Sequence, residues 1–81
     1  MDMKTILITG ASSGIGKETA ILFANKGWNV AATMKNEEHF SLFANHKLIR
    51  SYLLDVNNRA SIEKAINQAI LDFGSIDVIV N

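Results

Sequence analysis

The 81-residue sequence contains no cysteine and no proline, and it has only two histidines. Without cysteine there is no disulfide and no thiolate metal ligand, so two common supports of small domains are missing. The histidines, His39 and His46, are not accompanied by a flanking ligand pattern, which argues against a structural zinc ion. We therefore expect no metal site, and a fold that depends on its apolar core.

An excess of charge of one sign is also missing, because eight basic and eight acidic residues cancel. Nucleic-acid binding and a polybasic membrane anchor both need clustered Lys and Arg, so neither partner is expected. No apolar run approaches the ~20 residues that cross a bilayer. Polar Thr9 and the Gly/Ser run at residues 10–16 interrupt the opening apolar stretch, unlike a signal peptide. The sequence accordingly predicts a cytoplasmic protein.

The composition, 48% hydrophobic and 20% charged, is that of a folded globular unit. No repeat, low-complexity tract or charge block marks a linker, so we expect residues 1–81 to form a single domain. Short apolar runs predict strands at residues 4–9, 29–34, 48–54 and 76–80. Apolar residues at helical spacing predict helices at residues 14–26, at 36–45, and between a cap at Asn57 or Asn58 and Gly74.

Each long helix has an expected apolar face. For the first helix the face consists of Ile15, Thr19, Leu22 and Phe23, and Gly27 follows as terminator. For the second it consists of Ile62, Ala65, Ile66, Ala69, Ile70 and Phe73. Strands that alternate with helices predict a parallel sheet. The expected class is α/β, the N-terminal portion of a Rossmann-type doubly wound parallel sheet with strand order 3-2-1-4, truncated after the fourth strand.

The glycine-rich segment, residues 9–16 (TGASSGIG), follows the first predicted strand and opens the first helix. Gly10 permits a tight turn, Gly14 lets the backbone approach a ligand, and Gly16 allows the helix to lie close to the sheet. Free N–H groups and the positive end of the helix dipole then converge on one spot. This arrangement suits a pyrophosphate.

The glycine spacing separates this segment from two other phosphate loops. The fingerprint G-x-G-x-x-G would need glycines where Ser12 and Ile15 stand. The nucleoside-triphosphate loop G-x-x-x-x-G-K-[ST] would need a glycine at Ala11 and a hydroxyl residue at Glu18. Nucleoside triphosphate hydrolysis is therefore not favoured.

The pattern T-G-x-x-x-G-x-G resembles the short-chain dehydrogenase/reductase family, and two further motifs extend the resemblance over the whole chain. Asp55-Val56 matches an Asp-Val pair that the family carries after its third strand. Residues 77–81 are similar to the approach to the family's Asn-Asn-Ala-Gly run, with Asn81 at its first position. The resemblance implies an NAD(P)-dependent oxidoreductase that transfers hydride between the cofactor and a carbonyl or alcohol substrate.

The resemblance also implies the roles of individual residues. The cofactor phosphates would be held by Gly10, Ser12, Ser13, Gly14, Ile15 and Gly16. Asp55 would accept a hydrogen bond from the adenine amino group, the Val56 backbone would complete the adenine contact, and Asn81 would lie beside the adenosine ribose. The position of Asp55 is also typical of a loop or helix-cap residue, and this structural role is compatible with the adenine contact.

The end of the second strand bears on the choice of cofactor. An acidic residue there selects NAD, and a basic one accommodates the 2′-phosphate of NADP. The acidic position of the family pattern falls at Met34, and Lys35 follows it. We therefore expect NADP(H) in preference to NAD(H), although Glu37 and Glu38 weaken the local positive field.

The family's catalytic residues are a Tyr and a Lys four positions later, and this pair is absent. The single tyrosine is Tyr52, which is followed four positions later by Val56 and lies in a predicted strand. No catalytic residue is therefore assigned, and the chain alone is expected to be inactive. The alternative is a non-catalytic nucleotide-binding or self-assembling α/β module. Residues 76–81 should expose an open apolar edge through which chains associate.

Overall fold

Strands and helices alternate along the chain, and the computed structural model describes them over residues 3–81. The strands are β1 (Thr5–Ile8), β2 (Asn29–Met34), β3 (Ile49–Leu53) and β4 (Val78–Val80). The helices are α1 (Gly14–Asn25), the short 3-10 helix η1 (Glu37–Phe43) and α2 (Arg59–Phe73). All pairs of neighbouring strands are parallel and the order is β3-β2-β1-β4, which confirms the predicted Rossmann-type sheet.

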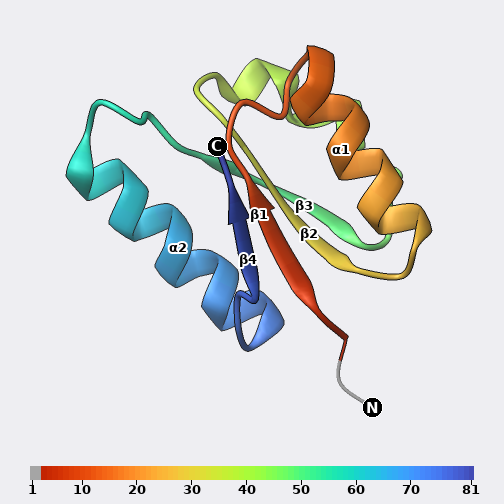
Figure 1. Cartoon of the computed structure of the whole chain (residues 1–81). Helices are drawn as coiled ribbons and strands as arrows, with labels where there is room; N and C mark the ends of the chain where they lie inside the picture. Colours follow the sequence, from red (N-terminus) through yellow and green to blue (C-terminus); the bar gives the residue numbers. More distant parts are fainter. Residues whose placement is uncertain (1–2) are drawn as a thin grey trace.

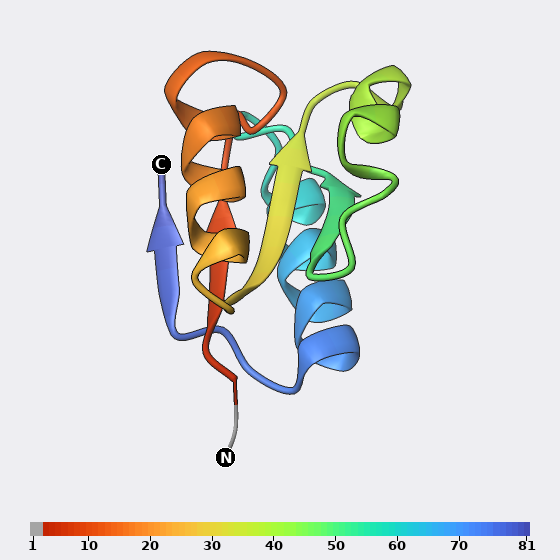
Figure 2. The same ribbon diagram turned by 90° about the vertical axis from the view of Figure 1, so that its right-hand side faces the viewer.

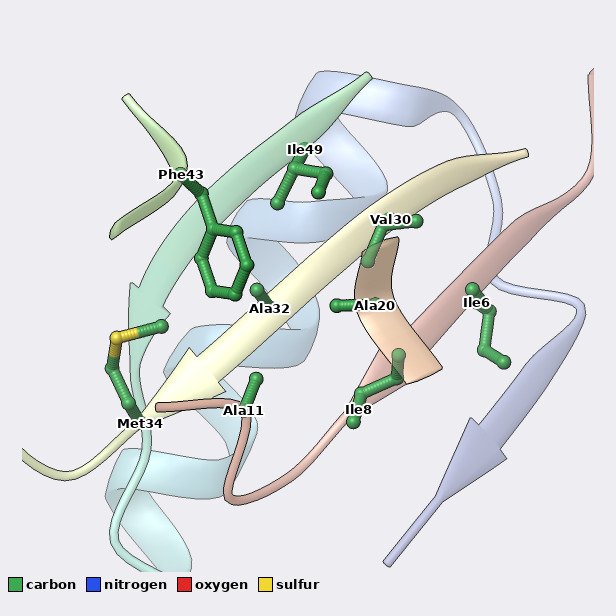
Figure 3. Close-up of a cluster of buried hydrophobic side chains, with 9 residues drawn as sticks. All are labelled: Ile6, Ile8, Ala11, Ala20, Val30, Ala32, Met34, Phe43 and Ile49. Atoms are coloured by element: carbon green, nitrogen blue, oxygen red, sulfur yellow. The ribbon is translucent and has the colours of Figure 1, made fainter. Parts of the chain in front are cut away.

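Helices cover both faces of the sheet, with α1 and η1 on one side and α2 on the other (Figure 1). Side chains of the strands alternate between two cores because successive residues point to opposite faces. Ile6 and Ile8 of β1 join the core under α1, whereas Leu7 joins the core under α2. Figure 3 shows the first core, where Ala20 of α1 lies over the sheet between Val30 and Ile8.

The predicted apolar face of α1 is correct only in part. Ile15 is 84% exposed and Leu22 is 51% exposed, whereas Ala20 is completely buried. Phe23 is the member of the predicted face that packs against the core, together with Ile21 and Ala24. The side of α1 that faces the sheet therefore carries both small and large side chains, and residue size alone did not identify it.

The predicted face of α2 is confirmed apart from Ile70, which is exposed. Ala65 and Ala69 are buried against the sheet, and Ile62, Ile66 and Phe73 pack around them. The Asn58 side chain caps the helix by accepting a hydrogen bond from the Ser61 N–H, at 3.1 Å. Gly74 follows the last turn with a φ of 92°, a conformation that favours glycine.

The largest boundary differences are at β4 and η1. The fourth strand begins at Val78 rather than at residue 76, and the Asp77 carboxylate accepts a hydrogen bond from the Thr5 N–H instead. The short helix has 3-10 rather than α geometry, and the Asn36 side chain caps it by accepting from the Glu38 N–H. No helix within residues 3–81 is both long and apolar enough to span a membrane.

Candidate functional site

The predicted site residues are gathered at the carboxyl end of the sheet, toward which all four strands point in Figure 2. The glycine-rich segment leaves β1, Lys35 follows β2, Asp55 and Val56 come after β3, and Asn81 follows β4. The chain passes from β1 to β2 on one side, and β4 lies on the other side of β1. Open α/β sheets bind ligands at such a switch point, outside the carboxyl ends of the strands.

Hydrogen bonds fix the start of the glycine-rich segment to the sheet. The buried Ala11 donates its N–H to the carbonyl oxygen of Thr33, at 3.0 Å. The buried Thr33 hydroxyl donates in turn to the Ile8 carbonyl oxygen, at 2.8 Å. Sequence reasoning missed Thr33, and its one signal was a hydroxyl in an otherwise apolar strand. The segment is therefore held by the two central strands before it reaches α1.

The three glycines of the segment serve different geometrical needs. Gly10 and Gly14 have φ values of 63° and 57°, in the left-handed region that side chains with a Cβ avoid. At Gly16 a Cβ would lie 2.2 Å from the carbonyl oxygen of Gly10. The close approach at Gly16 is thus made to the segment's own backbone, whereas the sequence analysis assigned it to helix–sheet contact.

Backbone donors remain available where α1 begins. The Lys17 N–H donates to the Ser13 carbonyl oxygen at 3.3 Å, which starts the helical hydrogen bonds. The preceding N–H groups, of Gly14, Ile15 and Gly16, have no partner within a helix. The Ser13 side chain does not cap them, and the first turn contains no acidic residue. Donors and the positive end of the helix dipole therefore face the same opening, an arrangement that binds phosphate groups.

The Asp55 side chain has a structural role. Its Oδ1 accepts a hydrogen bond from the Asn57 N–H at 2.9 Å, and the Asp55 N–H donates to the Ser61 hydroxyl, also at 2.9 Å. These bonds form the turn between β3 and α2, in agreement with the reading of Asp55 as a loop residue. Among the hydrogen bonds of residues 3–81, none uses Oδ2 of Asp55, so an adenine contact through that oxygen remains compatible with the turn.

A hollow of about 380 Å³ lies on the α2 side of the sheet, next to Thr9, and brings Val56 and Asn81 together. Thr9 lies at one end of it, where its single hydroxyl hydrogen is shared between two acceptors, Oδ1 of Asn81 at 3.3 Å and the Val80 carbonyl oxygen at 3.4 Å. The hollow is lined by Leu7, Thr9, Leu54, Val56, Ile62, Ile66, Ile79 and Asn81. Its apolar walls and polar end fit a flat heteroaromatic ring.

Lys35 and Met34 have opposite environments at the end of β2. Met34 is buried in the core beneath α1, near Phe43 (Figure 3). Lys35 is exposed. Of these two residues, Lys35 alone presents a charged side chain to solvent at the carboxyl end of the sheet.

Tyr52 packs in the core, as predicted from its place in a strand. Its side chain is largely buried under α2, and its hydroxyl donates to Oδ2 of Asp72 at 2.6 Å. Burial, the hydrogen bond to Asp72 and the negative charge of Asp72 raise the pKa of Tyr52 well above its usual value of 10.0. A tyrosine with a raised pKa is poorly suited to proton transfer at neutral pH.

Comparison with known proteins gives a consistent result. A family model described as short chain dehydrogenase matches residues 4–81. The 3-oxoacyl-(acyl-carrier-protein) reductase FabG of Thermotoga maritima is 35% identical over 86 aligned positions, which cover 100% of this chain and 35% of the relative.

Two crystal structures share the fold. A hydroxysteroid dehydrogenase from Escherichia coli superposes with a TM-score of 0.91 at 29% identity, over 99% of this chain and 35% of that one. A 3-ketoacyl-(acyl-carrier-protein) reductase from Brucella melitensis complexed with NADH superposes with a TM-score of 0.89 at 28% identity, over 96% and 33% respectively. The chain spans about a third of the length of each of these relatives.

Proposed function

Because this chain belongs to the short-chain dehydrogenase family, we propose that it is the cofactor-binding part of an oxidoreductase that transfers hydride between NADP(H) and a carbonyl or alcohol substrate. The observation that carries the proposal is the set of N–H groups at the start of α1 that have no partner within the helix. A Cβ built at Gly14 would meet no atom within 4 Å, so the opening has room for a ligand against the backbone.

The phosphates of the dinucleotide would bind along the glycine-rich segment. The N–H groups of Gly14, Ile15 and Gly16 would donate to phosphate oxygens, and the hydroxyls of Ser12 and Ser13 would add donors beside them. The positive end of the α1 dipole stabilises the negative charge. Gly10 contributes the turn that positions these donors.

The adenosine would extend from the phosphates toward the apolar hollow. Val56 and Asn81 line that hollow, and Asp55 lies in the chain between the lining residues Leu54 and Val56, with one carboxylate oxygen outside the turn. A volume of about 380 Å³ lies within the range of ligand sites. The NADH complex of the Brucella melitensis relative supports a nicotinamide dinucleotide as the ligand class.

Lys35 would select NADP(H) over NAD(H) by attracting the 2′-phosphate. We expect Lys35→Ala to weaken NADPH binding by about fivefold, or about 1 kcal/mol, and to leave NADH binding within twofold. Calorimetric titration of the chain with both cofactors measures the effect. The matched control is Lys26→Ala, because Lys26 follows the C-terminal end of α1, away from the glycine-rich segment. Equal affinity for NADPH and NADH in the wild-type chain would contradict the role of Lys35.

Hydride transfer would need residues that this sequence does not contain. Tyr52 is the single tyrosine; its ring packs in the core and its hydroxyl donates a hydrogen bond to Asp72. When bound, the cofactor supplies the hydride, while these 81 residues bind and orient it. We accordingly propose that the chain alone is inactive toward carbonyl and alcohol substrates, and that the protein acts in the cytoplasm.

Association through β4 is the alternative activity that a specific observation favours. Val78, Ile79 and Val80 are all exposed, and β4 is an edge of the sheet. An exposed apolar edge strand pairs readily with another chain. Self-association at this edge therefore stays a prediction for the isolated chain.

A further inference from the structure

A second surface, separate from the dinucleotide site, follows the outer edge of β3. A groove of about 680 Å³ runs there between η1 and α2. Phe40 and Leu53 form one side, and Lys64, Leu71 and Asp72 form the other. Leu53 is 45% exposed and Leu71 is 85% exposed, so both walls of the groove present apolar surface to solvent. We call this surface the β3 groove.

The floor of the β3 groove consists of backbone groups without strand partners. At the two ends of β3, the flanking residues bond to β2: the Leu48 carbonyl oxygen accepts at 2.8 Å and the Leu54 N–H donates at 2.9 Å. Peptide groups of a strand alternate in direction, so the N–H and C=O groups of Ser51 and Leu53 point away from β2. Residues 3–81 supply no strand beyond β3 in the sheet. The edge is therefore a template for another strand, with a wall on each side.

We propose that two copies of this chain pair through their β3 edges, antiparallel about a two-fold axis at Ser51. Ser51 of each copy would exchange two hydrogen bonds with Ser51 of the other, and Leu53 would stand opposite Ile49 of the second copy. The two sheets would continue into each other, and Leu71 of each α2 would be covered by the neighbouring helix. The interface is self-complementary, as a two-fold dimer requires.

Charge complementarity favours a second copy as the occupant of the groove. In this register Arg50 lies opposite Tyr52 of the second copy, on the face of the sheet that α2 covers. The Tyr52 hydroxyl is bonded to Asp72, so Arg50 would approach a carboxylate across the axis. The two α2 helices would run antiparallel, which brings Lys64 of one toward Asp72 of the other. Arg50 and Lys64 of one copy would thus both approach Asp72 of the other.

The β4 edge is a different exposed surface that also offers a route to association. The experiment therefore blocks pairing through β4 first. The Val80 carbonyl oxygen bonds to β1, so the neighbouring Ile79 directs its N–H outward. Ile79→Pro deletes that donor, and proline is tolerated on an edge strand where its missing N–H faces solvent. This single variant is the parent protein for the test of the β3 groove.

Sedimentation velocity or light scattering on the 81-residue chain then measures the mass. The Ile79→Pro parent is expected to form a dimer, and so is its Ser51→Ala derivative, the matched control. Adding Ser51→Pro instead removes the outward N–H of β3 and should give a monomer whose circular dichroism matches the parent. A monomeric parent, or a dimer that survives Ser51→Pro, would overturn the proposal.

A second variant leaves the backbone unchanged. Arg50→Glu in the Ile79→Pro parent sets a carboxylate against Asp72 of the second copy, so the dimer dissociation constant should rise about tenfold or more. Arg50→Lys keeps the charge and should stay within about threefold of the parent. If Arg50→Glu dimerises as tightly as the parent, the two copies do not meet in this register and the proposal is wrong.

Discussion

Gly16 shows how one missing methyl group shapes the candidate site. Its backbone passes so close to Gly10 that a Cβ would lie 2.2 Å from the Gly10 carbonyl oxygen and 3.2 Å from the Cα of Ala11. These are backbone atoms, and Ala11 is buried and bonded to β2. They have no side-chain rotamer with which to relieve the overlap, so the donors at the start of α1 depend on glycine at this position.

Gly16→Ala should therefore displace the glycine-rich segment. We expect the free energy of unfolding to fall by about 1–3 kcal/mol, as for other overpacked positions, and NADPH affinity to fall at least about tenfold. Denaturant unfolding and calorimetric titration give the two quantities.

Gly27→Ala is the matched control for Gly16→Ala. Gly27 has a φ of 88°, open space around its missing Cβ, and a location after the far end of α1. Alanine there should cost about 1–2 kcal/mol of backbone strain and leave NADPH affinity unchanged. Equal NADPH affinities in the two variants would show that the close contact at Gly16 does not shape the site.

At the scale of elements, the sequence predicted which segments form helices and strands better than it predicted how they pack. The buried face of α2 could be predicted because large aliphatic residues and alanines recur on one side of the helix. The face of α1 was predicted only in part, because Ile15 and Leu22 are exposed whereas Ala20 is buried and Phe23 packs beside it. Hydrophobic spacing alone does not show which of two neighbouring apolar stripes on a helix faces the sheet.

The contact between β3 and α2 includes a hydrogen bond that has a measurable pH dependence. Burial and Asp72 raise the pKa of Tyr52 above its value of 10.0 in an unfolded chain. Neutral Tyr52 thus contributes stability that is fully present below about pH 10 and is lost as the pH rises through and beyond that value.

Tyr52→Phe removes this contribution and the hydrogen bond to Asp72. We expect the variant to unfold with about 1 kcal/mol less free energy at pH 7. The difference from the wild type should shrink above about pH 10, where unfolded Tyr52 ionises. Denaturant unfolding at several pH values measures it, with Ser51→Ala as a control that leaves the bond intact. A difference in the free energy of unfolding between wild type and Tyr52→Phe that stays constant up to about pH 11 would contradict this role of the Tyr52–Asp72 hydrogen bond.

At the scale of the whole molecule, the strand order could be predicted because few topologies join alternating strands and helices by right-handed crossovers. The positions of Gly10, Gly14, Gly16, Asp55 and Asn81 at one end of the sheet follow from that order. The bonds that hold the site together do not follow from it. Thr33 reaches Ile8 across 25 residues and Thr9 reaches Asn81 across 72, so no local pattern reveals them.

The central claim is that backbone amides at the start of α1 hold the phosphates of a nicotinamide dinucleotide. Amide chemical shifts of the ¹⁵N-labelled chain, followed during titration with NADPH, test it residue by residue. The largest shifts should fall on residues 12–16, with smaller ones at Lys35, Val56 and Asn81. Shifts that centre on the β3 groove and leave residues 12–16 unmoved would contradict it.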